Sequence, residues 1–465
     1  MSSEAAGWTG HVMWWQVYPL GFVGAEVRPE DGREARPGGE GGGGEVQPGG
    51  KGGEVQHRLG RIEGWLEHVI GLGLNGLALG PVFAASTHGY DTVDHFTIDP
   101  RLGDLDDFDR LVGAARERGI RVLLDGVFNH VGRAHPLFRH VEEHGPDSPH
   151  AELFRIDWNG WRSGQPVPAE VFEGHDALVA LDHDSPAVAE LVTEVMLHWL
   201  GRGIDGWRLD AAYAVPPAFW ARVLPRVREQ YPEAWFSGEV IHGAGAELVR
   251  ESTVDSLTQY ELWQAIWHGI ADRNLFELAH GLERHDALLD SFVPSTFVGN
   301  HDVTRIASAV GDGFVGHALA VLFTVAGVPS VYAGDEFGWH GVKEERIGGD
   351  DAVRPVFPDS PPTEEDLPGA GARILHEHRQ LIELRRRHPW LHTAHTEAVE
   401  VANEKLVFRS VGGDGEGGIL TALNLSDEPQ RVPVPGDAVV AAGSGRREGD
   451  AVVVPEREWA VVSYE

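Results

Sequence analysis

The sequence predicts an α/β protein built on a (β/α)8 TIM barrel, with a small insertion after the third strand and a C-terminal antiparallel β domain. Three observations support this fold class. Short apolar segments alternate with amphipathic helical segments over most of the 465 residues, as is typical of parallel strands joined by helices. Residues 131–185 interrupt the alternation with irregular sequence, and after residue 395 short alternating runs replace it.

The barrel strands are predicted from apolar runs bounded by polar or turn residues. Helical periodicity separates these runs, for example in DLDDFDRLVGAARERG (104–119) and SPAVAELVTEVMLHWLGRG (185–203). The number of repeated units favours a closed barrel over an open sheet. The predicted strands lie within residues 14–22, 76–83, 120–128, 205–210, 234–240, 295–302 and 328–336.

The chain divides into three predicted domains. Residues 1–130 and 186–394 form the barrel, and residues 131–185 form an inserted subdomain because an irregular stretch of this length is too long for an ordinary connection. Residues 395–465 form a β-sandwich domain of short strands. Within the barrel, residues 24–57 are mainly Gly, Glu and Pro with almost no apolar anchor, so we expect a mobile surface loop there.

The amino-acid composition of the chain indicates which classes of binding partner are unfavourable. The formal net charge of −34 is unfavourable for binding nucleic acid or an anionic membrane, since both require basic surface, and it favours a neutral or cationic substrate. The absence of cysteine excludes disulfides and cysteine-ligated zinc. We find no secretion signal and no apolar run long enough to span a bilayer, so we expect a cytoplasmic protein. The sequence does not predict the oligomeric state.

Charged or amide side chains follow most of the predicted strands. The C-terminal ends of barrel strands meet on one face, where active sites of this fold are built, so these side chains should converge there. Several carboxylates at one end of the barrel repel one another, which costs stability. Such a cluster therefore indicates a function. The residues are Asp125, Asn129, His130, Arg208, Asp210, Glu239, His301, Asp302, Asp335 and Glu336.

Arg208 and Asp210 lie two residues apart in the run GIDGWRLDAAYAV (203–215). Side chains at this spacing in a strand project from the same face. The two are either a structural ion pair or a reactive carboxylate held ionised by a guanidinium that does not deprotonate. The other strand-end residues favour the second interpretation.

Four motifs resemble those of the α-amylase family of glycoside hydrolases, in the family's order and rough spacing. The resemblance extends over roughly residues 8–390. In sequence, the motifs are closest to those of the group of neopullulanases, cyclomaltodextrinases and oligosaccharide α-glucosidases. We expect this chain to lack the N-terminal β domain of that group. The motifs are DGVFNH (125–130), GWRLDAAY (206–213), SGEV (237–240) and FVGNHD (297–302).

The resemblance implies that an α-glucosidic bond is cleaved with retention of configuration. Asp210 would be the nucleophile, Glu239 the acid that protonates the leaving oxygen, and Asp302 a third carboxylate that binds sugar hydroxyls. The chemistry itself requires these residue types, because a retaining glycosidase uses one ionised and one protonated carboxyl about 5 Å apart. Arg208 would then keep Asp210 ionised.

The resemblance also implies substrate-binding residues. His130 and His301 match family positions that hydrogen-bond the sugar at the reaction centre. Tyr90, with His88 in the segment THGYD, matches the ring on which that sugar stacks. Asp125 either anchors its loop or contacts the sugar, and the sequence does not decide between the two roles.

Other residues match family positions less closely. Asp351 and Arg354 follow the eighth strand, where related oligosaccharide-acting members carry an Asp/Arg pair, but the spacing differs. Asn129 matches a calcium ligand of secreted α-amylases, although its partner ligands are not identifiable in the short insertion. We therefore expect no cofactor and do not favour bound calcium. Trp158 and Trp161 either line outer sugar subsites or pack the insertion.

The predicted function is hydrolysis of α-glucosidic bonds in soluble maltooligosaccharides or related α-glucans. Ala211 follows the nucleophile where members cleaving α-1,6 bonds often carry Val, which favours the α-1,4 linkage. A glucanotransferase uses the same covalent intermediate and is the alternative. A catalytically silent barrel acting as a binding subunit is a third interpretation, against which the presence of Asp210, Glu239 and Asp302 argues.

Overall fold

The computed structural model describes residues 7–25, 55–243, 245–346, 348–413 and 417–464. The predicted mobile loop at 24–57 therefore lies mostly outside the described residues. Within these ranges, no helix combines the length and the apolar character that crossing a membrane requires.

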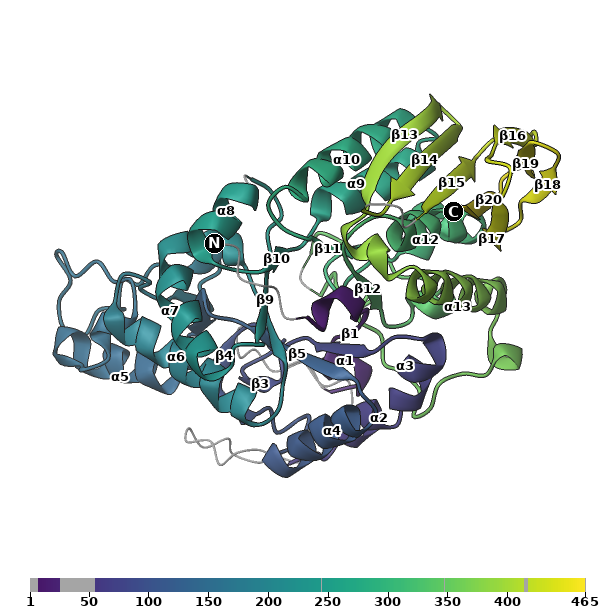
Figure 1. Ribbon diagram of the computed structural model, residues 1–465. Helices are drawn as coiled ribbons and strands as arrows, with labels where there is room; N and C mark the ends of the chain where they lie inside the picture. Colours follow the sequence, from purple (N-terminus) through teal and green to yellow (C-terminus); the bar gives the residue numbers. More distant parts are fainter. Residues whose placement is uncertain (1–6, 26–54, 244, 347, 414–416, 465) are drawn as a thin grey trace.

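Eight parallel strands form the central sheet in the order β10-β9-β8-β5-β2-β1-β12-β11 (Figure 1). A parallel bridge between Thr258, which follows β10, and Ser295 of β11 joins the two edges of the sheet. The predicted (β/α)8 barrel is thus confirmed. Its strands are β1 (Trp14–Val17), β2 (Gly76–Leu79), β5 (Arg121–Gly126), β8 (Gly206–Leu209), β9 (Trp235–Gly238), β10 (Ser256–Leu257), β11 (Ser295–Phe297) and β12 (Val328–Tyr332).

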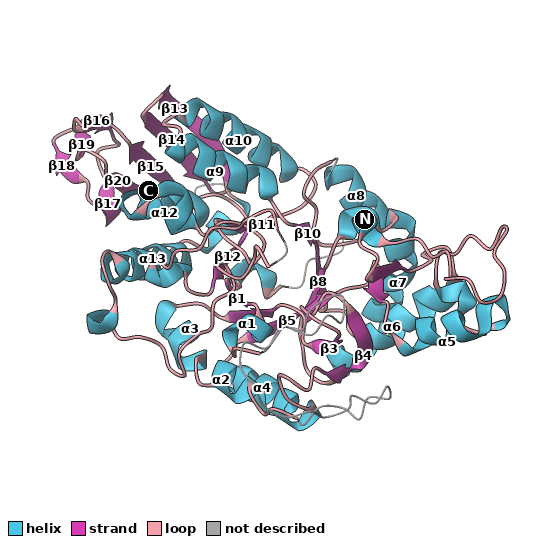
Figure 2. Ribbon diagram, turned by 180° about the vertical axis from the view of Figure 1, so that it is seen from behind, coloured by secondary structure: helices cyan, strands magenta, loops and turns pink. Residues whose placement is uncertain are grey.

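Helices surround the sheet (Figure 2), and their ends follow sequence signals. Asp104 and Asp107 form a capping box at the start of α4, and the buried Phe108 and Leu111 give this helix an apolar face. The helices are α1 (Pro19–Phe22), α2 (Leu59–Glu63), α3 (Leu66–Leu72), α4 (Leu105–Glu117), α6 (Pro186–Gly201), α7 (Pro217–Gln230), α8 (Gly245–Ser252), α9 (Tyr260–Ala271), α10 (Leu275–Leu288), α11 (Ile306–Val310), α12 (Val315–Thr324) and α13 (Gly371–Arg387).

The insertion after β5 contains the helix α5 (Pro136–His144) and a small antiparallel sheet of β6 (His130–Gly132) and β7 (Leu178–Ala180). A second short antiparallel pair, β3 (Phe83–Ala85) and β4 (Thr92–Ile98), follows β2. Figures 1 and 2 show α5 and the C-terminal strands at opposite ends of the molecule. The insertion therefore extends the barrel on the side away from the C-terminal domain.

Two antiparallel sheets form the C-terminal domain, in the orders β13-β14-β15-β20-β17 and β16-β19-β18. The larger sheet packs on the barrel, where the hydroxyl of Thr421 donates to that of Thr324 at the end of α12 over 2.9 Å. The strands are β13 (His395–Ala402), β14 (Lys405–Val411), β15 (Gly418–Asn424), β16 (Gln430–Pro433), β17 (Val439–Gly443), β18 (Arg446–Glu448), β19 (Ala451–Val454) and β20 (Trp459–Tyr464).

Candidate active site

The guanidinium of Arg208 contacts three carboxylates from three neighbouring strands. Its Nη1 lies 2.7 Å from Oδ2 of Asp125 and 2.8 Å from Oδ1 of Asp210, and its Nη2 lies 2.6 Å from Oε1 of Glu239. The strands β5, β8 and β9 are adjacent and parallel, so the acids that lie at their C-terminal ends meet around one cation.

Burial dominates the electrostatics of this cluster. It raises the pKa of Asp210 well above the usual carboxyl range, while Arg208 acts in the opposite direction. Burial likewise raises the pKa of Asp125, again opposed by Arg208. The effect of Arg208 on Asp210 has the expected direction, but the cost of removing these carboxylates from water acts against it.

Glu239 is held by two further donors. The backbone N–H of Ala211 donates to its Oε2 at 3.0 Å, and the hydroxyl of Tyr260 donates to its Oε1 at 3.1 Å. Ala211 has a φ of 45°, in the left-handed region that residues other than glycine rarely adopt. Such conformations concentrate at functional sites; here it follows Asp210 directly and presents its N–H to Glu239.

Asp302 lies between two basic side chains. Arg354 Nη2 donates to its Oδ1 at 2.8 Å, and Nε2 of His301 lies 3.0 Å from its Oδ2. Although burial opposes it, contact with His301 and Arg354 holds the pKa of Asp302 well below its usual range. The Asp302 side chain is 29% exposed, against 10% for Asp210 and 9% for Glu239. An ionised carboxylate is therefore the most accessible of the three acids.

Three rings are stacked beside this carboxylate. His301 lies nearly parallel to Tyr90 at a centroid distance of 5.6 Å and to Tyr18 at 5.9 Å. The Tyr90 hydroxyl donates to Oδ2 of Asp125 at 3.1 Å and also contacts the His301 ring. The Tyr18 hydroxyl donates to the carbonyl of His88 at 2.5 Å. The structure thus brings the sequence-predicted residues His88, Tyr90, Asp125 and His301 together.

His130 contacts the cluster through Tyr90. Its Nε2 donates to the Tyr90 carbonyl at 3.0 Å, and its Nδ1 lies 3.2 Å from the amide nitrogen of Asn129. Burial lowers the pKa of His130 to about 4, so the ring is neutral near pH 7. Both ring nitrogens are engaged within the protein, which gives His130 a positioning contact with the loop of Tyr90.

Two features of the region after β12 differ from the prediction. The acid paired with Arg354 is Asp350, whose Oδ2 lies 3.1 Å from Nη2, and not Asp351. A spacing of four residues in this loop, rather than three, places the carboxylate beside the guanidinium.

Asp335 and Glu336 also differ from the prediction, because neither joins the Arg208 cluster. Asp335 Oδ1 lies 2.7 Å from Nη1 of the fully buried Arg305, and Glu336 Oε1 lies 3.0 Å from Nε2 of His68. The chain turns at Gly334, which has a φ of 95° and lies two residues after Tyr332, the end of the last barrel strand β12. The two carboxylates are therefore buried in the packing around β12.

The amide nitrogen of Asn129 lies 3.2 Å from Nδ1 of His130. Among the histidine, aspartate and glutamate side chains of the described residues, three have metal-ligand spacing: His57, Asp104 and Asp107. Asp104 and Asp107 already accept the backbone hydrogen bonds of the α4 capping box. This group therefore serves the helix terminus.

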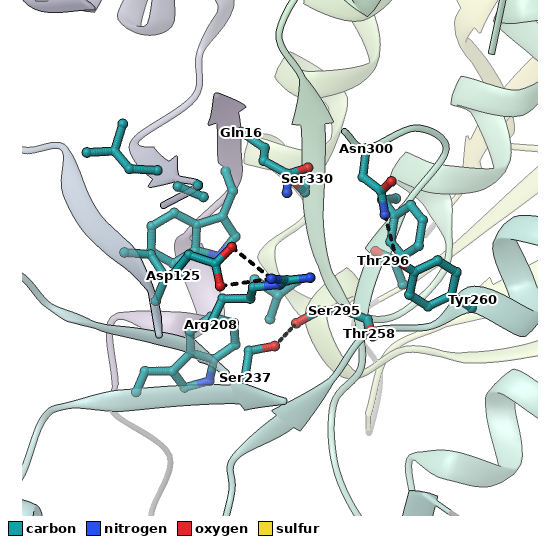
Figure 3. Close-up of a pocket in the computed structure, with 18 residues that line it drawn as sticks. Gln16, Asp125, Arg208, Ser237, Thr258, Tyr260, Ser295, Thr296, Asn300 and Ser330 are labelled. Carbon is teal, nitrogen blue, oxygen red and sulfur yellow. Dashed lines mark hydrogen bonds and ion pairs between the residues drawn. The ribbon is translucent and has the colours of Figure 1, made fainter. Parts of the chain in front are cut away.

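A cavity of about 70 Å³ inside the barrel reaches Asp125 and Arg208 (Figure 3). Small polar residues contribute to its lining, and the hydroxyls of Ser237 and Ser295 lie 2.8 Å apart. A buried water molecule needs about 10–15 Å³ of cavity volume. The cavity can hold a few waters beside the guanidinium but is too small for a sugar.

Tyr18, Tyr260 and Asp350 are site residues that were not predicted from the sequence. Tyr260 begins α9, outside the four motifs, and Asp350 lies in an irregular loop. The available signal for Asp350 was its position four residues before Arg354, and the sequence offered no such signal for Tyr260.

Comparison with known proteins agrees with this geometry. The family model "Alpha amylase, catalytic domain" matches residues 59–367. Cyclomaltodextrinase from Bacillus sp is 35% identical over 294 residues, which is 59% of this chain and 51% of the relative. Neopullulanase 2 from Thermoactinomyces vulgaris is 33% identical over 336 residues, covering 69% of this chain and 54% of the relative. The chain thus spans about half the length of these two curated relatives.

A solved structure resembles the whole chain. Cyclic α-maltosyl-(1→6)-maltose hydrolase from Arthrobacter globiformis, in complex with its cyclic substrate, superposes with a TM-score of 0.79 at 26% identity, covering 99% of this chain and 100% of that one. The family match covers more than half of the chain, and the carboxylate cluster lies at the motifs that carry the resemblance. The chain therefore belongs to the α-amylase family.

Proposed function

We propose that this protein is a retaining α-glycosidase that hydrolyses α-1,4-glucosidic bonds of soluble maltooligosaccharides or related α-glucans. The observation that carries the proposal is the contact of one guanidinium, that of Arg208, with both Asp210 and Glu239. Two carboxyls sharing one guanidinium favour the short separation of about 5–5.5 Å used by retaining enzymes.

In the first step Asp210 attacks the anomeric carbon while Glu239 gives its proton to the glycosidic oxygen. The bond between the anomeric carbon and the glycosidic oxygen breaks. The protonated leaving sugar departs, and the remaining glycosyl group is bound to Asp210 as an ester. In the second step Glu239 removes a proton from water, which attacks the same carbon and releases Asp210. Two inversions restore the original configuration.

The other residues support this chemistry. Arg208 favours the ionised form of Asp210 against the effect of burial. Asp302, held ionised by His301 and Arg354, accepts hydrogen bonds from sugar hydroxyls. Tyr90 and His301 provide ring surfaces beside the bound sugar.

The names of relatives support the substrate class. They include cyclomaltodextrinase, neopullulanase 2 and "Intracellular maltogenic amylase" of Bacillus subtilis, the last 30% identical over 355 residues. These names favour soluble glucan oligosaccharides, and the last also favours an intracellular location.

A glucanotransferase is the second candidate. One relative, 30% identical over 305 residues, is named 4-alpha-glucanotransferase of Thermotoga neapolitana. Transfer differs from hydrolysis only in whether a sugar hydroxyl or water attacks the intermediate.

Product analysis tests the proposal. The enzyme is incubated with maltose, maltotriose, isomaltose, trehalose, sucrose and cyclodextrin, and the first product is followed by NMR before mutarotation. The proposal expects shorter sugars released in the α configuration from maltotriose or cyclodextrin. Longer oligomers would favour transfer, and a β-configured first product would exclude the retaining mechanism.

A further inference from the structure

The segment that follows Asp302 and the loop that follows β12 hold each other through two arginines. Arg354 of the loop donates to Oδ1 of Asp302 at 2.8 Å and to the carbonyl of His301 at 2.9 Å. In the other direction, Nη2 of Arg305 donates to the carbonyl of Val353 at 3.0 Å. Val353 directly precedes Arg354 in the chain. The contact made by Arg305 therefore holds the backbone from which Arg354 reaches Asp302.

The other contacts of Arg305 join it to the end of β12. Its Nη1 donates to the carbonyl of Ala333 at 3.0 Å and to Oδ1 of Asp335 at 2.7 Å. Its guanidinium carbon lies 4.4 Å from the ring centroid of Tyr332, whose hydroxyl donates to the same Val353 carbonyl at 2.8 Å. Two donors thus converge on the carbonyl of Val353, and both are anchored at the last strand of the barrel.

The carboxylate of Asp335 also touches the chain just before Asp302. Gly299 has no side chain, and a Cβ atom added there would overlap Oδ2 of Asp335. The carboxylate therefore lies directly against the backbone of Gly299, three residues before Asp302. Arg305 lies three residues after Asp302. The buried pair of Arg305 and Asp335 thus contacts the chain on both sides of the third carboxylate.

Stability alone is a weak explanation for this pair. Removing two charges from water costs free energy that their mutual attraction often fails to recover. Burial raises the pKa of Asp335 to about 6, although Arg305 opposes the rise. Oδ2 of Asp335 and Nε of Arg305 are also buried without a hydrogen-bond partner among the described residues, which adds to the cost. The guanidinium does supply a rigid fork of donors that fixes the direction of several contacts at once.

We propose that Arg305 is a positioning residue for Asp302, because it holds the Val353 carbonyl and thereby places the guanidinium of Arg354 against Asp302. Arg305 is fully buried, so it cannot touch a substrate itself. Its loss should weaken the hold of Asp302 on sugar hydroxyls more than it slows bond cleavage. This inference rests on the proposed function, in which Asp302 binds the sugar.

The first test replaces Arg305 by lysine, which keeps the charge beside Asp335 but lacks the planar fork that reaches both backbone carbonyls. We expect Arg305→Lys to raise KM for maltotriose about three- to tenfold, with a smaller change in kcat. α-Maltosyl fluoride should show the same rise in KM, because Asp302 holds the sugar whose anomeric carbon reacts in both substrates.

The double variant Arg305→Lys/Arg354→Gln separates positioning from a general loss of structure. If Arg305 acts through Arg354, its replacement in the Arg354→Gln protein has no contact left to disturb. KM should then change by less than about twofold between Arg354→Gln and the double variant. A general structural defect would instead raise KM by the same factor in both backgrounds.

The matched control is Arg385→Lys. Arg385 is also a buried arginine that donates to backbone carbonyls, those of Val325 and Gly327 at 2.7 Å each. These carbonyls lie at the opposite end of β12, so this variant should lower the temperature of unfolding and leave KM at the parental value. If Arg305→Lys does not fold, Tyr332→Phe takes its place, since it removes the second donor to Val353 and keeps the ring.

The outcomes separate the two claims. No turnover of either substrate by the parent protein would overturn the proposed function, and this inference with it. With an active parent, a parental KM in every folded variant at Arg305 and Tyr332 would overturn the positioning role alone. A rise in KM that multiplies with that of Arg354→Gln, or that Arg385→Lys reproduces, would also overturn the positioning role.

Discussion

The hydroxyl of Tyr260 donates a 3.1 Å hydrogen bond to Oε1 of Glu239, and it accepts one of 3.0 Å from the amide of Asn300. Asn300 in turn accepts from the backbone N–H of Asp302 at 2.8 Å. Tyr260 therefore connects the loop of the predicted acid with the loop of the third carboxylate. This chain of bonds fixes the direction of Glu239.

We expect Tyr260→Phe to lower kcat/KM on maltotriose about tenfold, on the scale of one hydrogen bond to a charged group. The loss should be smaller with α-maltosyl fluoride, because fluoride leaves with little help from an acid. Tyr213→Phe is the control, since its hydroxyl bonds to Glu173 at 2.8 Å and not to Glu239. Equal losses on both substrates would mean that Tyr260 does not act through the acid.

The pH dependence of kcat/KM should report the environment of Asp210. Burial raises its pKa and Arg208 opposes the rise, so the acid limb should lie above the pH at which an ordinary aspartate titrates. Arg208→Gln removes the opposing charge and should move the limb to still higher pH, with kcat falling by about a hundredfold or more. Arg208→Lys keeps the charge and should shift the limb less.

Arg228→Gln is the control for this measurement, because Arg228 pairs with Asp255 at 2.8 Å away from the cluster. It should leave the limb in place. A limb that stays put, or moves to lower pH, in Arg208→Gln would contradict the role given to the guanidinium.

Arg354 should affect substrate binding through Asp302. Arg354→Gln removes the 2.8 Å contact with Oδ1, so the pKa of Asp302 should rise and its hold on sugar hydroxyls should weaken. We expect KM to increase about tenfold with a smaller change in kcat. Lys343→Gln alters the same loop and another partner of Asp350. A matching rise in KM for Lys343→Gln would show that the loop, and not the Asp302 contact, is responsible.

A chelator should leave turnover unchanged. The amide nitrogen of Asn129 faces His130 at 3.2 Å, and the described three-residue group with ligand spacing caps α4 instead. Activity is measured before and after EDTA treatment and calcium addition. Strong inhibition that calcium reverses would show that Asn129 has coordination partners.

Much of the barrel could be predicted because its strands and helices have strong periodicity. The helix at 105–117 carries both a capping box and an apolar face. The strand β10 was missed because it has two residues, Ser256 and Leu257, and a period cannot be recognised over that length. The pair of strands β3 and β4 was missed because polar residues interrupt its apolar pattern.

The site was predictable where residues follow strands and less so elsewhere. Asp125, Asp210 and Glu239 meet because their strands are neighbours, and motif order already implied this. Tyr260 reaches Glu239 from the start of a helix, and Asp350 reaches Arg354 from a loop, so only the folded chain reveals these contacts. The raised pKa of Asp210 also depends on how deeply the cluster is buried.

The most direct measurement is identification of the residue that carries the sugar. In Glu239→Gln, α-maltosyl fluoride can still form the ester, but the missing base slows its hydrolysis, so the intermediate accumulates. Proteolysis and mass spectrometry should find the sugar on the peptide that contains Asp210, and the double variant Asp210→Asn/Glu239→Gln should show none. A sugar on another residue such as Asp125, or no adduct despite release of fluoride, would contradict Asp210 as the nucleophile.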